Sequence, residues 1–160
     1  MKLEGSCRCG AVRFSCDAYA PVPFLHCYCS ICRKTAGGGG YAINLGAFAK
    51  TLKIRGEKNI GVYRAKISED GKTTTSTGRR SFCMKCGSFL WLFDPAWPNL
   101  VHPFASAIDT PLPKAHERVH MMLDFKAPWC DVPRGKSDLH VRRYPKESLE
   151  EWHRSRGLLA

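Results

Sequence analysis

Short segments in which apolar and polar residues alternate make up most of this chain. Residues 11–17 place Val12, Phe14 and Cys16 on one side and polar residues on the other, as in a half-buried strand. Cys16 lies on the apolar side, so we interpret it as core packing and not as a metal ligand. The same reasoning predicts strands at residues 41–45, 52–55, 60–67, 72–77, 89–93, 119–123 and 139–144, with short strands and loops around 100–108.

Helical periodicity is confined to short stretches. The pattern predicts one clear helix at residues 146–156, with Pro145 before its start and Gly157 at its end. Residues 33–36 suit a single helical turn, and the four glycines that follow at 37–40 predict a loop. Residues 73–77 favour a strand but have no apolar face, which predicts an edge strand or the wall of a wet cleft.

Length and composition indicate one ordinary globular domain spanning residues 1–160. Hydrophobic residues make up 44% of the chain and charged residues 24%, which argues against wholesale disorder. No apolar run approaches the ~20 residues of a membrane span, and the first residues lack a signal-peptide core. We therefore expect a cytoplasmic protein, and in that reducing compartment nine cysteines favour metal binding over disulfides.

The formal net charge of +11 favours anionic partners. The cations are scattered, and the longest cluster is a pair, as in Arg33-Lys34 or Arg79-Arg80. No basic arm or cation-rich helix is present, so the sequence argues against a nucleic-acid partner. A solvated basic surface is the simpler interpretation of most of these charges.

Three cysteines in six residues, Cys27, Cys29 and Cys32, form the central motif. Zinc prefers soft thiolate ligands, and a C-x-C-x-x-C run supplies three of them from one tight loop. Structural zinc sites are closed by four protein ligands, whereas catalytic sites keep one position open. No fourth cysteine adjoins the three, so this motif predicts an open, catalytic zinc site.

Two further cysteine pairs predict a second, closed zinc site. Cys7 and Cys9 are followed by Gly10, and Cys83 and Cys86 are followed by Gly87. Small residues let the backbone curl around a metal, and glycine supplies the positive φ that such a knuckle requires. The chain as a whole therefore predicts two zinc ions.

Several residues near these motifs have a functional and a simpler interpretation. Arg33 and Lys34 are candidates to hold an anionic substrate, and Gly38 and Gly39 to allow close backbone approach of a ligand; a solvated pair and a plain connection are the alternatives.

Five other residues are given the simpler interpretation. We expect His26 to be a strand histidine whose side chain points away from Cys27. We expect His120 and Asp124 to share one face of a strand, Cys130 to be a loop thiol without a function, and Trp129 to anchor the core or a lid.

Four motifs, in this order, resemble those of the glutathione-dependent formaldehyde-activating enzyme family, also called the centromere protein V family. They are Gly5-x-Cys7-x-Cys9-Gly10-x-Val12-x-Phe14, Cys27-x-Cys29-x-x-Cys32-Arg33-Lys34, Phe82-Cys83-x-x-Cys86-Gly87-Ser88 and Lys126-Ala127-Pro128-Trp129. The resemblance implies a β-tent of small twisted antiparallel sheets over a core of about residues 3–132, with residues 133–160 as a C-terminal extension. It also implies a structural zinc on Cys7, Cys9, Cys83 and Cys86 and a catalytic zinc on the other three.

Two functions follow from these patterns. The resemblance implies a carbon–sulfur lyase that joins glutathione and formaldehyde reversibly into S-hydroxymethylglutathione, and a three-thiolate zinc suits a small thiol substrate. The alternative is a non-catalytic zinc module that binds an anionic protein or nucleic acid. Four protein ligands at the second zinc would favour the module, and three would favour the enzyme.

Overall fold

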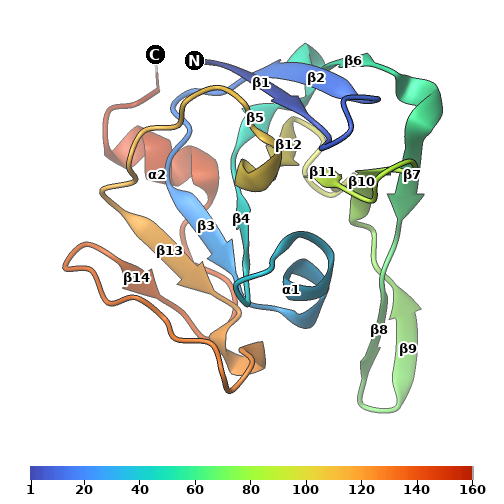
Figure 1. The fold of residues 1–160 in the computed structure, drawn as a ribbon. Coiled ribbons are helices and arrows are strands. Elements are labelled where there is room, and N and C mark those ends of the chain that lie inside the picture. Colours follow the sequence, from blue (N-terminus) through green and yellow to red (C-terminus); the bar gives the residue numbers. More distant parts are fainter. Residues whose placement is uncertain (160) are drawn as a thin grey trace.

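Small β-sheets make up most of the structure, a computed structural model that describes residues 1–159 (Figure 1). The strands are β1 Lys2–Ser6, β2 Arg13–Asp17, β3 Phe24–Cys27, β4 Ala42–Asn44, β5 Ala47–Phe48, β6 Lys53–Arg55, β7 Ile60–Tyr63, β8 Lys66–Glu69, β9 Lys72–Thr75, β10 Arg79–Cys83, β11 Phe89–Phe93, β12 Leu100–Pro103, β13 Arg118–Met121 and β14 Leu139–His140. The helices are α1 Ser30–Ala36 and α2 Leu149–Ser155, with 3-10 turns at Ala49–Thr51, Glu57–Asn59, Ala105–Ala107 and Leu123–Phe125. The predicted fold class, mainly β with a short C-terminal helix, is confirmed.

The main core lies between a three-stranded sheet, in the order β1-β2-β6, and a five-stranded sheet, in the order β5-β12-β11-β10-β7. Phe14 of β2 and Trp91 of β11 meet edge to face across this core, with ring centroids 5.0 Å apart. Cys16 is buried in the same cluster of side chains, which confirms that it packs in the core.

A four-stranded sheet, in the order β14-β13-β3-β4, carries the central cysteine motif. Strand β13 runs parallel to β3 and to β14, so this sheet adds parallel pairs to the antiparallel ones. The register pairs Met121 with Cys27, the last residue of β3. Helix α1 follows at once and lies between this sheet and β10–β11 (Figure 1).

One predicted strand is divided in two. The expected strand at residues 60–67 ends at Tyr63 because β7 pairs with β10 whereas β8 pairs with β9, and the chain changes partner at Ala65. Ala65 is buried, and its carbonyl accepts a hydrogen bond from the backbone of Ser76. The β8–β9 hairpin projects from the body with both strands exposed, which confirms the edge predicted for residues 73–75 (Figure 1).

Helix α2 begins later than predicted. Ser148 is its N-cap and forms a capping box with Glu151, so the helix starts at Leu149 and not near Pro145. Both α-helices have seven residues. Within residues 1–159 no helix is long and apolar enough to cross a membrane.

Candidate metal centres and the adjoining groove

Four thiols from distant parts of the chain form the first candidate metal centre. Cys7, Cys9, Cys83 and Cys86 place their sulfur atoms within 4.8 Å of one another. The Cys7–Cys9 and Cys9–Cys83 sulfur separations are 3.6 and 3.8 Å. Thiolates bound tetrahedrally to zinc at about 2.3 Å stand about 3.8 Å apart, so this donor set fits a zinc ion closed by four protein ligands.

The local backbone explains why these four thiols converge. Gly10 and Gly87 follow the second cysteine of each pair with φ of 78° and 76°, a conformation that favours glycine. Each glycine N–H donates to the carbonyl of the first cysteine, Cys7 or Cys83, at 3.1 and 2.8 Å. The Val12 N–H also donates to the sulfur of Cys7 at 3.2 Å. The two knuckles therefore present their sulfurs to a common point.

Three thiols from one tight loop form the second candidate centre. Cys27 ends β3, Cys29 is the N-cap of α1, and Cys32 lies in the first turn of that helix. Their sulfurs lie within 4.8 Å of one another, and among residues 1–159 no further cysteine, histidine or carboxylate belongs to the group. Cys27 and Cys32 are buried whereas Cys29 is partly exposed, so the open side of the cluster faces outward at Cys29.

The three thiols differ in acidity. Hydrogen bonds from the thiols of Cys27 and Cys32 hold the pKa of Cys29 well below its usual range. Hydrogen bonds to Cys29 and Cys32 raise the pKa of Cys27. The Cys32 backbone N–H also donates to the sulfur of Cys29, at 3.4 Å. A cation entering the cluster therefore meets at least one thiolate already formed, which suits a metal with a preference for soft anionic ligands.

A buried arginine faces this cluster. Arg80 of β10 is 5% exposed, and its Nη2 donates to the sulfur of Cys32 at 3.5 Å. Asn44 of β4 approaches the same sulfur at 4.0 Å. Arg79 is exposed whereas Arg80, the next residue, is buried, because successive strand residues point to opposite faces. This alternation does not continue along β10, where Ser81 and Cys83 are also buried and the register shifts after Ser81, so local spacing alone does not identify Arg80.

A buried polar chain lies beneath the same loop. His120 is completely buried; its Nδ1 lies 2.9 Å from the Tyr28 hydroxyl and its Nε2 lies 3.0 Å from Asp138. The expectation that His120 and Asp124 share a strand face is wrong, because β13 ends at Met121 and Asp124 lies in a 3-10 turn. Sequence reasoning did not identify Tyr28 or Asp138.

Burial and hydrogen bonds determine which of the two titratable side chains, His120 or Asp138, is charged. Burial alone would raise the pKa of Asp138, but hydrogen bonds from Arg118 and His120 hold it well below its usual range. Burial lowers the pKa of His120 despite the neighbouring carboxylate. Asp138 is therefore the ionised member, and the imidazole of His120 is neutral at neutral pH.

The remaining predicted residues occupy different positions. His26 lies in β3 as expected; its ring is 4% exposed, it has no hydrogen-bond partner, and burial lowers its pKa to about 4. Cys130 is a buried thiol that donates to the carbonyl of Gly39 at 3.3 Å. Trp129 is 66% exposed, so of its two predicted roles, anchor of the core or of a lid, the core is excluded; the tip of its ring lies close to Gly40.

A groove of about 660 Å³ runs along a neighbouring face of α1. Arg33, Lys34 and Gly38 line it, and Arg8 adds a third cation from the Cys7–Cys9 knuckle. Its polar wall also includes Ser6, Ser88, Ser106 and Asp109. Phe89 and Ala36 line the groove and also pack against the three-thiol cluster, so the two features adjoin.

The fold and the site together define a mainly β protein with one four-thiol and one three-thiol centre for metal ions. The sequence model of the family described as "Glutathione-dependent formaldehyde-activating enzyme" matches residues 2–123. The chain therefore belongs to this family.

Two similar proteins extend the comparison. A Halomonas elongata protein named "Putative glutathione-dependent formaldehyde-activating enzyme" is 56% identical over 158 residues, which cover 99% of this chain and 98% of that protein. A crystal structure of a Rhodobacter sphaeroides protein superposes with a TM-score of 0.51 at 25% identity, over 71% of this chain and 93% of that one. The similarity to the Halomonas protein includes the C-terminal residues beyond the family match.

Proposed function

We propose that this protein is a zinc-dependent carbon–sulfur lyase that acts on a thiol adduct such as S-hydroxymethylglutathione. The observation that carries the proposal is the group of three thiols, Cys27, Cys29 and Cys32, with an exposed side at Cys29. A zinc ion held by these thiolates would keep an open position for the sulfur of a substrate and favour its thiolate form. A non-catalytic module would close its second centre with a fourth protein ligand, and the count of three supports the enzyme.

The closed centre has a structural role in this proposal. Cys7, Cys9, Cys83 and Cys86 would hold a second zinc ion, which fastens the β1–β2 turn to the end of β10. Binding of a structural zinc contributes directly to folding free energy, because the site does not exist in the unfolded chain. All nine cysteines are free, so the seven thiols of the two centres are available to bind metal.

The groove along α1 suits the charges of glutathione. Glutathione carries two carboxylates and one ammonium group, and the groove offers cations at Arg8, Arg33 and Lys34 and one carboxylate at Asp109. The Nε atom of Arg33 is buried without a partner, so this guanidinium has unused donor capacity. Gly38 lines the groove and leaves its wall without a side chain, as a closely bound ligand would need. Gly39, the other glycine predicted to allow such approach, does not line the groove, and its carbonyl accepts a hydrogen bond from the Cys130 thiol.

The proposed reaction is the addition of a thiol to formaldehyde, in which the residues of the groove only position the substrate. In the synthetic direction the substrate thiol loses its proton, its sulfur forms a bond to the carbonyl carbon of formaldehyde, and the C=O π bond breaks. The carbonyl oxygen then takes up a proton, so no net proton is gained or lost; cleavage is the reverse. Arg33 and Lys34 would hold the carboxylates so that the sulfur reaches the three-thiol centre. Arg80 would balance the excess negative charge of three thiolates around a divalent ion.

The experiment that tests the proposal measures the exchange between ¹³C-formaldehyde and S-hydroxymethylglutathione by NMR, with and without the zinc-loaded protein. We expect the protein to accelerate the exchange, and Lys34→Ala to raise KM for glutathione without raising it for mercaptoethanol, which has no carboxylate. Lys50→Ala, a surface change outside the groove, is the matched control. No acceleration with a protein that holds two zinc ions would refute the lyase.

A further inference from the structure

Tyr28 is tied to the body of the protein at two points, although it lies within the cysteine motif itself. Its backbone N–H donates to the carbonyl of Met121 at 3.1 Å, and its hydroxyl reaches His120 Nδ1 at 2.9 Å. The side chain is completely buried. Because Tyr28 separates Cys27 from Cys29, whatever fixes its position also fixes the two sulfurs on either side of it.

The direction of each hydrogen bond in this chain is determined by chemistry. The carboxylate of Asp138 only accepts, so His120 Nε2, 3.0 Å away, carries the proton. The neutral imidazole then has a lone pair on Nδ1, which accepts a hydrogen bond from the Tyr28 hydroxyl. Asp138 is held in turn by a two-pronged ion pair with Arg118, at 3.1 and 2.7 Å, and by the backbone N–H of Gly135.

Asp138, which ends the row of hydrogen-bonded side chains from Tyr28 through His120, comes from the C-terminal extension. Asp138 lies beyond residues 2–123, which the family's sequence model matches, and directly precedes β14. Strand β14 adds to the sheet beside β13, and the backbone of Val141 donates to the carbonyl of His120. The extension thus holds the buried histidine by both its backbone and its side chain.

Core packing alone does not account for this arrangement. Burying a phenol, an imidazole and a carboxylate costs more than burying apolar side chains of similar size, unless every group is paired. Among the hydrogen-bonded side chains from Tyr28 to Arg118 every polar group has a partner, whereas the adjacent His26 ring has none. The paired groups connect Arg118 and Asp138 to Tyr28, which lies between Cys27 and Cys29.

We propose that Tyr28, His120 and Asp138 are positioning residues of the three-thiol centre, and that the C-terminal extension is a working part of that centre. The inference rests on the proposed function only in that the three thiols hold a metal ion. Groups that orient metal ligands typically change metal affinity or activity by about 10–100-fold when they are altered. A loosened Tyr28 would leave the sulfurs of Cys27 and Cys29 free to move apart.

The test follows release of zinc from the loaded protein to a coloured chelator. The wild type is expected to release metal in a fast phase from the three-thiol centre and a slow phase from the four-thiol centre. Tyr28→Phe and Asp138→Asn are each expected to accelerate the fast phase about tenfold and leave the slow phase unchanged. The double variant is expected to add little to either single change, because both break the same chain.

Glu117→Gln is the matched control, since it removes another carboxylate contact that fastens the extension, far from the cysteine loop. The inference is overturned if the two variants leave the fast phase unchanged, accelerate both phases equally, fail to fold, or act no more strongly than Glu117→Gln. Release of the metal from the wild type in a single phase would show that the three-thiol centre is not a separate, weaker zinc site. That result would refute the proposed function and this inference together. That result is distinct from an intact fast phase that the variants do not alter.

Discussion

The guanidinium of Arg80 donates to the sulfur of Cys32 across 48 positions of sequence, at 3.5 Å and with both residues buried. A buried cation is costly unless an anion faces it. Among residues 1–159 Arg80 forms no ion pair with a carboxylate, and its Nε has no partner. Its position is therefore explained by negative charge on the cysteine cluster, and a zinc ion with three thiolates carries a net charge of −1.

This relationship predicts a large effect for Arg80→Met. We expect the zinc-loaded variant to lose about 3 kcal/mol of unfolding free energy, because one partner of a buried charge pair is removed, and to release the metal of the three-thiol centre faster. Denaturant unfolding and metal release measure the two effects. Arg79→Met is the control, since Arg79 is the exposed neighbour in the same strand. Equal effects of the two substitutions would contradict the role given to Arg80.

Substitution of the two buried cysteines Cys83 and Cys16 should destabilise the protein to very different extents. Cys83→Ser removes a ligand from the four-thiol centre, so we expect loss of one metal ion and much of the folding free energy. Cys16 is 1% exposed, and burial raises the pKa of its thiol to about 11, so it stays protonated and packs as an apolar group. Cys16→Ala should cost only about 1–2 kcal/mol. Thermal melts that rank the two variants the other way would refute the structural centre.

Cys29→Ser should separate activity from stability. It removes the most exposed ligand of the three-thiol centre while the other four cysteines still close theirs. We expect one zinc ion per chain in place of two, no catalysed exchange, and a melting temperature within a few degrees of the wild type. Metal analysis and calorimetry provide the measurements, and Cys130→Ser, which changes a thiol outside both centres, should keep both metals. Unfolding as severe as that of Cys83→Ser would contradict the division into two centres.

Sequence reasoning found the cysteines because their chemistry is local. Each ligand pair or triplet lies within six residues, and the glycines at 10 and 87 mark the two knuckles. Counting ligands then divided seven cysteines into a group of four and a group of three, as the structure groups them. Alternation located strands such as β2, β6 and β11, but it missed β1 and β10 and extended the segment 139–144 beyond the end of β14 at His140. It also joined β7 to β8, because a change of pairing partner leaves no mark on the apolar pattern.

The residues around the cysteines could not be assigned in the same way. His120 and Asp138 are 18 positions apart and meet only because β14 lies beside β13, a parallel pairing that no local pattern encodes. For Trp129 the sequence left the core and a lid open, and only the core is excluded: a large aromatic side chain favours burial on average, but this one is exposed and lies close to Gly40. Such contacts depend on the assembled sheets and not on spacing.

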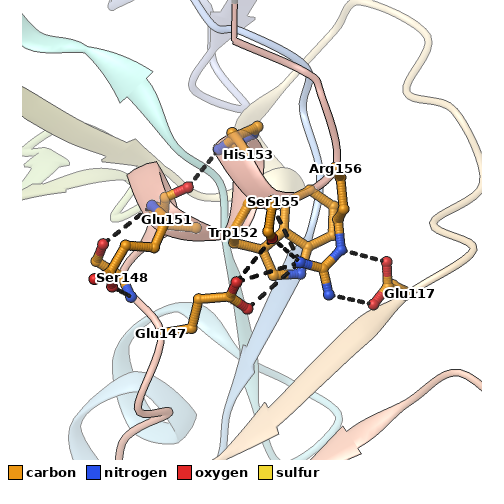
Figure 2. Close-up of polar contacts among 9 residues, drawn as sticks. Glu117, Glu147, Ser148, Glu151, Trp152, His153, Ser155 and Arg156 are labelled. Carbon is orange, nitrogen blue, oxygen red and sulfur yellow. Dashed lines mark hydrogen bonds and ion pairs between the residues drawn. The ribbon is translucent and has the colours of Figure 1, made fainter.

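The last prediction concerns how the C-terminal helix is fastened. Arg156 donates to both oxygens of Glu117 at 2.8 Å, and its guanidinium lies 4.2 Å from the ring of Trp152, which is buried against the body (Figure 2). The same guanidinium approaches Glu147 at 3.4 Å. Hydrogen bonds from Arg156 lower the pKa of Glu117 below its ordinary value.

The lowered pKa fixes the sign of the pH dependence for Glu117→Gln. The Glu117 carboxylate is charged at neutral pH in both the folded and the unfolded protein. As the pH falls, the unfolded protein takes up the proton first, near pH 4.3. The stabilisation by the ion pair is therefore present above that pH and is lost as the pH falls through the folded-state pKa. We expect the wild type to melt about 1–3 °C above the variant at pH 7, since a partly exposed pair contributes little. The difference should shrink as the pH falls below about 4.3 and vanish once the folded protein has also taken up the proton. Melts of both proteins at each pH cancel any acid loss of metal, and Glu150→Gln, which breaks the exposed pair with Arg154, should show a smaller difference throughout. A difference that persists or grows in acid would show that Glu117 does not fasten the helix through its charge.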